Sequence, residues 1–170
     1  MNETLGYIQM LDRVSKAVDK LPARAATEAV NFSKERFRAQ NWIDSHTQPW
    51  KRRKATRGES NRRSGRAILV DTGRLRRSIR KISVTNTSAT IGTDVPYAQA
   101  HNDGFRGKVN QRVRAHSRKT AKGKTSNVKA HSRTININIP RRRFIGSSAQ
   151  LVKNIERMMT LEIKRAINNR

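Results

Sequence analysis

The sequence contains no cysteine, which excludes disulfide bonds, thiolate zinc sites and cysteine nucleophiles. Aromatic residues make up only 5% of it and hydrophobic residues 34%, whereas roughly 45 to 50% of an average soluble domain is apolar. The length of 170 residues suits one domain. We therefore expect residues 1–170 to form a single domain with a thin hydrophobic core, which gains part of its order from partner subunits.

Acidic residues are scarce as well. Only 12 Asp and Glu stand against 38 Lys and Arg, which gives a formal net charge of +26 at pH 7. Such an excess attracts polyanions and raises the rate of association with them. Three kinds of partner fit it: nucleic acid as the true ligand, an acidic protein, or packaged DNA nearby in a particle. Composition alone does not separate the three.

Long apolar runs are absent from the start of the chain, where Glu3, Asp12 and Lys16 interrupt the apolar positions. This pattern fits neither a signal peptide nor a membrane span, and we expect the protein to be cytosolic when it is made. The helices predicted below need their apolar faces for the core, which disfavours a membrane-active role.

Residue combinations that carry common enzymatic chemistry are also missing. The histidines have no carboxylate cluster beside them, and His116 and His131 lie in basic segments whose positive potential disfavours a bound cation. The His-Asn-Asp segment 101–103 would suit a nuclease only if several further carboxylates converged on a metal ion. No glycine-rich loop has the Walker spacing. We therefore expect no enzymatic activity, no metal and no cofactor.

Apolar residues at three- and four-residue steps predict helices at both ends of the chain. Residues 3–21 and 23–40 show this period, and Pro22 is placed to begin the second of two N-terminal helices. After a cap at Ser147-Ser148, apolar positions from Leu151 to Ile167 trace a final amphipathic helix.

Shorter elements are predicted between these helices. Asp71 or Thr72 is placed to cap a helical turn, residues 80–93 alternate as a β-hairpin, and a short helix begins near Pro96 and ends at Gly104. Residues 134–140 alternate isoleucine with asparagine, which indicates a half-buried strand. The fold class is therefore α+β: N-terminal helices, a small antiparallel sheet with a long basic β-hairpin, and a C-terminal helix.

The most basic stretches have no apolar period. Residues 51–66 form a long basic loop. The segment Val113–Arg118 recurs as Val128–Arg133 around a Lys-, Gly- and Thr-rich tract, which predicts a basic hairpin arm over residues 108–134. Neither stretch interleaves aromatic residues with basic ones, so contact with nucleic acid would be non-specific and made through phosphates.

Four short segments occur in order along the chain: Pro49-Trp50-Lys51, ILVDTGRLRRSI at 68–79, VPYAQAHNDG at 95–104 and IPRRRFIG at 139–146. In these segments the sequence resembles the phage virion morphogenesis family, which comprises tail-completion and neck proteins of contractile-tailed phages and Mu-like prophages. The run Arg141-Arg142-Arg143 departs from the family pattern, which more often has a second small or proline residue before the phenylalanine.

The resemblance implies a structural virion protein in the neck or tail region, which acts in tail completion and head-tail joining after assembly in the host cytoplasm. It implies a homo-oligomeric ring, with sixfold symmetry as one candidate, next to connector, tail terminator or tail tube proteins. Non-specific contact with packaged DNA belongs to the same expectation, and membrane contact does not. The alternative is a non-specific nucleic-acid-binding protein, for which the charge of +26 is the entire case.

Two groups of candidate residues follow. Those expected to contact a partner or DNA are the basic residues of the loop and the arm: Lys51, Arg52, Arg53, Lys54, Arg62, Arg63, Arg114, Arg118, Lys119, Lys122, Lys124, Lys129 and Arg133. Those expected to serve packing, caps and turns come from the four family-like segments: Trp50, Thr72, Gly73, Leu75, Tyr97, His101, Gly104, Pro140, Phe144 and Gly146.

Overall fold

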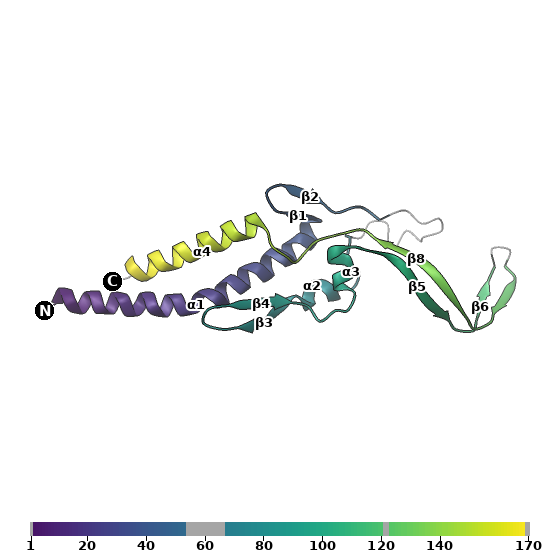
Figure 1. The fold of residues 1–170 in the computed structure, drawn as a ribbon, viewed down its shortest axis with the longest axis horizontal. Coiled ribbons are helices and arrows are strands. Elements are labelled where there is room, and N and C mark those ends of the chain that lie inside the picture. Colours follow the sequence, from purple (N-terminus) through teal and green to yellow (C-terminus); the bar gives the residue numbers. More distant parts are fainter. Residues whose placement is uncertain (1, 54–66, 121–122, 169–170) are drawn as a thin grey trace.

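Two antiparallel helices run side by side along one half of the elongated protein, and a β-hairpin arm projects from the other half (Figure 1). The computed structural model describes residues 2–53, 67–120 and 123–168. Both ends of the chain lie opposite the arm (Figure 1). The elements in chain order are α1 (Asn2–Ala39), β1 (Asn41–Ile43), β2 (Thr47–Pro49), α2 (Arg74–Ser78), β3 (Arg80–Val84), β4 (Ala89–Gly92), α3 (Ala98–Asp103), β5 (Phe105–Val113), β6 (His116–Lys119), β7 (Thr125–Val128), β8 (His131–Ile139) and α4 (Ala149–Asn168).

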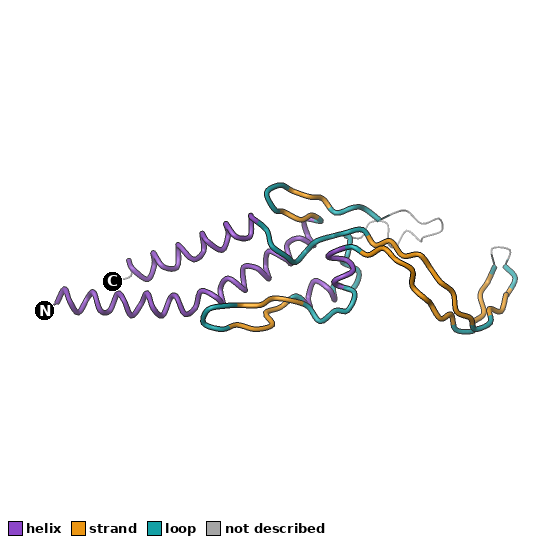
Figure 2. The backbone as a smooth tube through the Cα atoms, viewed as in Figure 1, coloured by secondary structure: helices purple, strands orange, loops and turns teal. Residues whose placement is uncertain are grey.

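The predicted α+β class is confirmed, but the strands do not form one sheet. They form two-stranded antiparallel ribbons with the pairings β1–β2, β3–β4, β5–β8 and β6–β7. The hairpin predicted at 80–93 is β3–β4, which lies against α1. The β1–β2 hairpin was not predicted, because strands of three residues are too short to show an alternating pattern. Figure 2 shows helix at one end of the molecule and strand at the other.

The two predicted N-terminal helices are one continuous helix, so the predicted break at Pro22 is wrong. Proline inside a helix removes one backbone hydrogen bond and commonly bends the helix, and Figure 1 shows α1 bending about midway. Leu21 and Ala26, on either side of the proline, are both buried. Packing of this stretch against the neighbouring elements therefore keeps the helix continuous across Pro22.

The start of α2 also differs from the prediction by one or two residues. The N-cap position is Gly73, whose φ of +73° lies in the left-handed region that glycine adopts readily. The hydroxyl of Thr72 accepts a hydrogen bond from the backbone N–H of Arg74 at 3.3 Å. The turn between the apolar run 68–70 and α2 therefore uses glycine as its cap residue, with Thr72 one position before it.

Polar contacts join α1 to α4 along their length. Asn154 donates a hydrogen bond to the Glu28 carboxylate at 3.3 Å, and the Arg13 Nε donates one to the carbonyl of Ala166 at 3.2 Å. Arg24 and Glu162 form an ion pair between the same two helices. The side chain of Ser148 caps α4 by accepting the N–H of Leu151, as predicted, and donates to the Ile43 carbonyl.

The hydrophobic core is small and centres on Phe37, whose side chain is fully buried. Its ring lies 5.5 Å from the ring of Trp50, edge to face, and 5.0 Å from that of Phe144. Trp50 also donates a hydrogen bond from its indole nitrogen to the Arg143 carbonyl at 2.9 Å. The other buried members of this cluster are Val30, Leu75, Ile79, Val95 and Ala98. One side chain of α1 thus holds together the segments that follow β2 and β8.

We predict that Phe37→Ala lowers the free energy of unfolding by about 3 to 5 kcal/mol, because it removes a buried ring from a core that has few others. Urea unfolding followed by tryptophan fluorescence measures this loss. Leu5→Ala is the matched control: Leu5 lies on the same helix with 57% of its surface exposed, and its truncation should change the stability little. Equal losses in the two variants would contradict the central position of Phe37.

Candidate functional site: the basic arm

The arm, which comprises residues 105–139, is a hairpin with two tiers. It projects from the rest of the protein, which we call the body (Figure 1). In the inner tier β5 pairs with β8 without a register shift, from Phe105 opposite Ile139 to Val113 opposite His131. In the outer tier β6 pairs with β7. The predicted hairpin is confirmed, and it is longer at both ends than residues 108–134. The half-buried strand predicted at 134–140 is the returning strand of this arm, paired with residues that the sequence had not linked to it.

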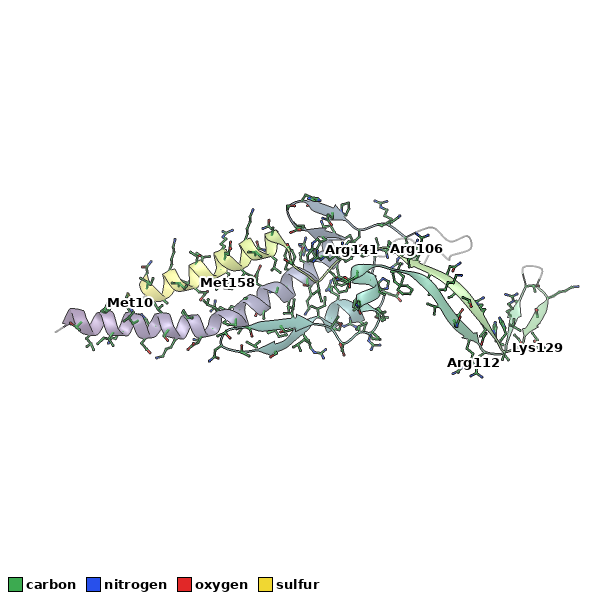
Figure 3. All side chains as sticks on the ribbon, in the orientation of Figure 1. Met10, Arg106, Arg112, Lys129, Arg141 and Met158 are labelled. Carbon is green, nitrogen blue, oxygen red and sulfur yellow. The ribbon has the colours of Figure 1, made fainter. Side chains whose placement is uncertain are left out.

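The charge of the arm has one sign. Residues 105–139 contain ten Lys and Arg and no Asp or Glu. No ion pair between two described residues involves the arm. The labelled side chains in Figure 3 show the basic residues spread along it, with Arg106 near its root and Arg112 and Lys129 near the junction of the two tiers. The arm therefore presents an unopposed positive surface.

The inner tier has two unlike faces, because residues paired in the ladder share a face and successive residues alternate. One face is mostly apolar and carries Phe105, Val109, Val113, Ile135, Ile137 and Ile139. The other is polar and basic and carries Arg106, Lys108, Arg112, Asn136 and Asn138. Phe105 is 40% exposed and Val109 is 37% exposed. A ribbon only two strands thick leaves this apolar face partly open to solvent.

The two tiers meet at an interruption of the ladder, which we call the elbow and which comprises residues 114–115 and 129–130. The repeated segments noted in the sequence cross it. Val113 ends β5 and His116 begins β6, while Val128 ends β7 and His131 begins β8. Val113 faces His131, and Val128 faces His116. The sequence repeat therefore corresponds to a local twofold relation between the two strands, centred on the elbow.

Each repeat makes the same side-chain contact at the elbow. Nδ1 of His116 lies 2.9 Å from the carbonyl oxygen of Arg114, and Nδ1 of His131 lies 2.9 Å from that of Lys129. A carbonyl oxygen can only accept, so Nδ1 carries the proton in both rings. The histidines thus provide donors to two carbonyls that stand in the gap between the ladders.

Residues at the end of α3 form hydrogen bonds at the root of the arm, where β5 begins and β8 ends. The side-chain oxygen of Asn102 accepts hydrogen bonds from the backbone N–H groups of Phe144 and Ile145, both at 3.0 Å, and the carbonyl of His101 accepts one from the N–H of Arg142 at 2.8 Å. Gly104 then turns the chain into β5 with a φ of +80°, where a Cβ atom would lie 3.1 Å from the backbone nitrogen of Arg141. These contacts hold together the segment that leads into β5 and the segment that follows β8, which we call the two feet of the arm.

The candidate residues for packing fall into two places. Trp50, Leu75 and Phe144 are buried in the core. Tyr97 and His101 lie one helical turn apart with their ring centroids 6.0 Å from each other, edge to face. The turn residues lie where the chain changes direction: Gly73 before α2, Gly104 before β5, and Pro140 and Gly146 between β8 and α4.

The candidate contact residues do not form one cluster. Arg114 and Lys129 lie at the elbow, Arg118, Lys119 and Lys124 in the outer tier, and Arg133 in the inner tier, where its Nε donates to Gln111 at 3.0 Å. All six are exposed. Lys51, Arg52 and Arg53 are exposed on the body after β2. Lys54, Arg62, Arg63 and Lys122 lie outside the described residues.

Two residues with clear structural roles were not among the candidates. Arg142 is 7% exposed, and its guanidinium Nε donates to the Lys51 carbonyl at 3.0 Å. Burial, and then the neighbouring charge of Arg53, lower the pKa of Arg142. Asn102 clamps the root of the arm, as described above. No sequence signal distinguished Arg142 from the arginines on either side of it, and Asn102 sits in a segment that indicated only a short helix.

Within residues 2–53, 67–120 and 123–168, the structure has no group of three or more His, Asp or Glu placed to hold a metal ion. In the same part of the chain, no helix combines the length and the apolarity needed to cross a membrane.

We compared the chain with known protein families, curated proteins and solved structures. The model of the phage virion morphogenesis family matches residues 6–164. No curated protein and no solved structure matches the chain. The matched range includes the body, the arm and most of both long helices.

We predict that His116→Ala combined with His131→Ala loosens the elbow, because two carbonyls lose their donors. The chain has no cysteine, so spin labels at Lys153→Cys on α4 and Thr125→Cys in the outer tier report one distance by pulsed electron resonance. The distance distribution should broaden in the double variant. Lys108→Ala with Asn136→Ala, a facing pair in the inner ladder, is the control and should leave the distribution narrow. Equal widths in both variants would exclude the histidines as fixing groups.

A pH dependence of stability follows from His101. Burial, and then the charge of Arg142, lower the pKa of His101 below its ordinary value of 6.5. The unfolded chain then binds more protons than the folded one, so the stabilising contribution of this group is present above about pH 6.5 and is lost as the pH falls through the lower folded pKa. Urea unfolding between about pH 5 and pH 7.5 should show stability rising with pH. The rise should be smaller in His101→Asn, and an unchanged rise would contradict the assignment.

Proposed function

The chain belongs to the phage virion morphogenesis family, and from that premise we propose that it is a subunit of the neck of a tailed phage, where it completes the tail and joins it to the head. The family match supports a structural or assembly role in the virion. The position at the neck rests on the arm, whose construction suits contact with neighbouring proteins.

The arm carries this proposal because it is built to be covered. An isolated two-stranded hairpin is marginally stable in water, and this one exposes an apolar face along its inner tier, with Phe105 40% and Val109 37% exposed. Contact with a neighbouring protein would bury that face and stabilise the ribbon. Packaged DNA would suit the basic face, which carries Arg106, Lys108 and Arg112. Contact with DNA would leave the apolar face exposed to solvent. The two faces together favour a position between proteins.

A second interaction surface lies at the other end of the molecule, on the first half of α1. Its exposed apolar side chains are Leu5, Tyr7, Ile8, Leu11 and Val18. A ring built by rotation needs two different surfaces on each subunit, since every interface is head to tail. The arm and this helical surface are two such surfaces at opposite ends. We therefore propose a homo-oligomeric ring, with sixfold symmetry as one candidate, next to connector, tail terminator or tail tube proteins.

The charge of +26 leaves a second candidate, non-specific binding of nucleic acid by the isolated chain. Such binding would be independent of sequence and would weaken steeply with salt, because it rests on phosphate contacts. It would not need the arm's apolar face or the exposed stripe of α1. A neck subunit uses both, which is why we place it first.

We predict that shortening the arm abolishes assembly without unfolding the body. Val113 and His131 face each other in the ladder, so replacing residues 114–130 by Asn-Gly closes the inner tier with a two-residue turn. The variant should keep its helical circular dichroism and its unfolding midpoint. In complementation of a phage that lacks the gene, it should yield separate heads and tails, which electron microscopy of the lysate can count.

The control for this experiment keeps the arm's length and lowers its positive charge. It changes six of the arm's ten basic residues to Gln, namely the described candidate contact residues Arg114, Arg118, Lys119, Lys124, Lys129 and Arg133. Partial assembly with this control and none with the shortened arm would assign the main effect to the length and shape of the arm, because both variants keep the apolar face of the inner tier. Normal infectious particles from the shortened variant would refute the role of the elbow and the outer tier in joining.

A further inference from the structure

A pocket of about 390 Å³ lies at the root of the arm, where the family-like segments come together. One wall is residues 68–75, which run from the apolar segment Ile68–Val70 into α2, and the opposite wall is α3 with Tyr97 and His101. Arg53 and Arg142 complete the lining from the segments that follow β2 and β8. Arg142, which lines the pocket, directly follows Arg141, which is labelled in Figure 3. The pocket is separate from the basic surface of the arm itself.

The apolar wall of the pocket is held in place by specific contacts. The side chain of Gln40 accepts a hydrogen bond from the N–H of Ile68 at 2.7 Å and donates one to its carbonyl at 3.1 Å. The next residue, Leu69, has a φ of +61°, in the left-handed region that a leucine rarely adopts. Strained backbone of this kind persists where the surroundings enforce it, and it occurs often at binding sites. The wall is therefore fixed in advance of any ligand.

Positive charge dominates the lining. Three guanidinium groups, those of Arg53, Arg74 and Arg142, share the pocket with a single carboxylate, that of Asp71. No ion pair between two described residues includes any of these three arginines. Arg142 is 7% exposed and its Nε bonds a backbone carbonyl, not a carboxylate. A buried cation is stable when an anion or several hydrogen bonds compensate its lost hydration.

His101, which lines the pocket, carries a polar atom that has no hydrogen-bond partner among the described residues. Nδ1 of His101 is buried and makes no hydrogen bond to another described residue. Buried polar atoms in native structures are usually satisfied, and an exception often marks a missing partner. Burial and the charge of Arg142 lower the pKa of His101, so its ring is neutral at pH 7 and one of its nitrogens is a donor. Arginine and a neutral imidazole are both suited to bind a carboxylate oxygen.

We propose that this pocket is a binding site for an acidic side chain, Asp or Glu, supplied by a neighbouring virion protein. Three arginines in a recess can bind one carboxylate through charge-assisted hydrogen bonds. The walls formed by Ile68, Leu69 and Tyr97 suit the apolar residues beside it in a peptide. The inference deepens the proposed function, on which it rests for the identity of the donor. The preference of the pocket for a carboxylate does not depend on that function.

A phosphate of duplex DNA fits the pocket less well. Duplex DNA carries its charges on a convex surface, one per about 1.7 Å of axis, so one phosphate could enter this recess only if its neighbours faced the apolar wall and Asp71. A protein can present one carboxylate on a protruding turn. The hydrogen bond from the backbone N–H of Arg142 to the His101 carbonyl lies at the feet of the arm. A ligand bound in the pocket would therefore also stabilise the position of the arm relative to the body.

The test is a titration of the full chain, labelled with ¹⁵N, with the peptide Ac-Ala-Leu-Glu-Leu-Ala-NH₂ and its Gln counterpart. Side-chain signals of Arg142 and His101 report on the pocket. The Glu peptide should shift them saturably and bind about tenfold more tightly than the Gln peptide, as expected for gain of charge-assisted hydrogen bonds. The combined variant Arg53→Gln and Arg74→Gln changes exposed residues only and should remove this difference. Arg157→Gln, an exposed arginine on α4 outside the pocket, should keep it.

Three outcomes would overturn the proposal: no shift with the Glu peptide, equal binding of both peptides, or unchanged Glu binding in the Arg53 and Arg74 variant. A separate titration uses a short DNA duplex in place of the peptides. If the duplex shifts the same signals and competes with the Glu peptide, the pocket is a phosphate site and the proposal fails in that form. These results concern the pocket alone. Failure of the proposed neck function would appear in the assembly experiment with the shortened arm, whatever the peptides do.

Discussion

Phe37 contacts the two aromatic side chains that fix the rest of the protein to α1. Trp50 belongs to the segment after β2, and Phe144 to the segment that leads from β8 to α4. Because the core is small, few other apolar contacts can hold these segments. Trp50 also bonds the backbone of Arg143, next to Phe144. The position of both feet of the arm, and of the pocket beside them, therefore depends on one buried ring cluster.

The arm combines features that would be unfavourable in an isolated protein. It projects as a ribbon two strands thick, its inner tier exposes apolar side chains on one face, and its charge is entirely positive. Like charges along the arm repel one another and oppose its order. An acidic neighbour would offset this repulsion, and an apolar neighbour would bury the exposed apolar side chains. The elbow adds a defined bend, because the repeated His residues bond the carbonyls that the ladder leaves open. The construction suits a subunit whose protrusion is completed by other proteins.

The sequence predicted the elements whose signals are local. The three- and four-residue spacing of apolar residues located the final helix. Alternation of apolar and polar residues located β3–β4 and β8, and the repeated segment indicated a hairpin. It did not predict that α1 continues through Pro22, because the packing that holds Leu21 and Ala26 comes from distant parts of the chain. Nor did it show that β5 pairs with β8, since pairing register depends on three-dimensional contact. Arg142 resembled its neighbours in sequence, and only the fold buries it and turns it toward Arg53 and His101.

The central claim is that this protein occupies the junction of head and tail. Gold-labelled antibody against the chain, applied to purified particles and viewed by negative-stain electron microscopy, tests it most directly. A subunit of the neck should carry label at the neck, with none along the tail or over the head. Particles that carry no label, with the protein left in the soluble lysate, would contradict it and would place non-specific nucleic-acid binding first.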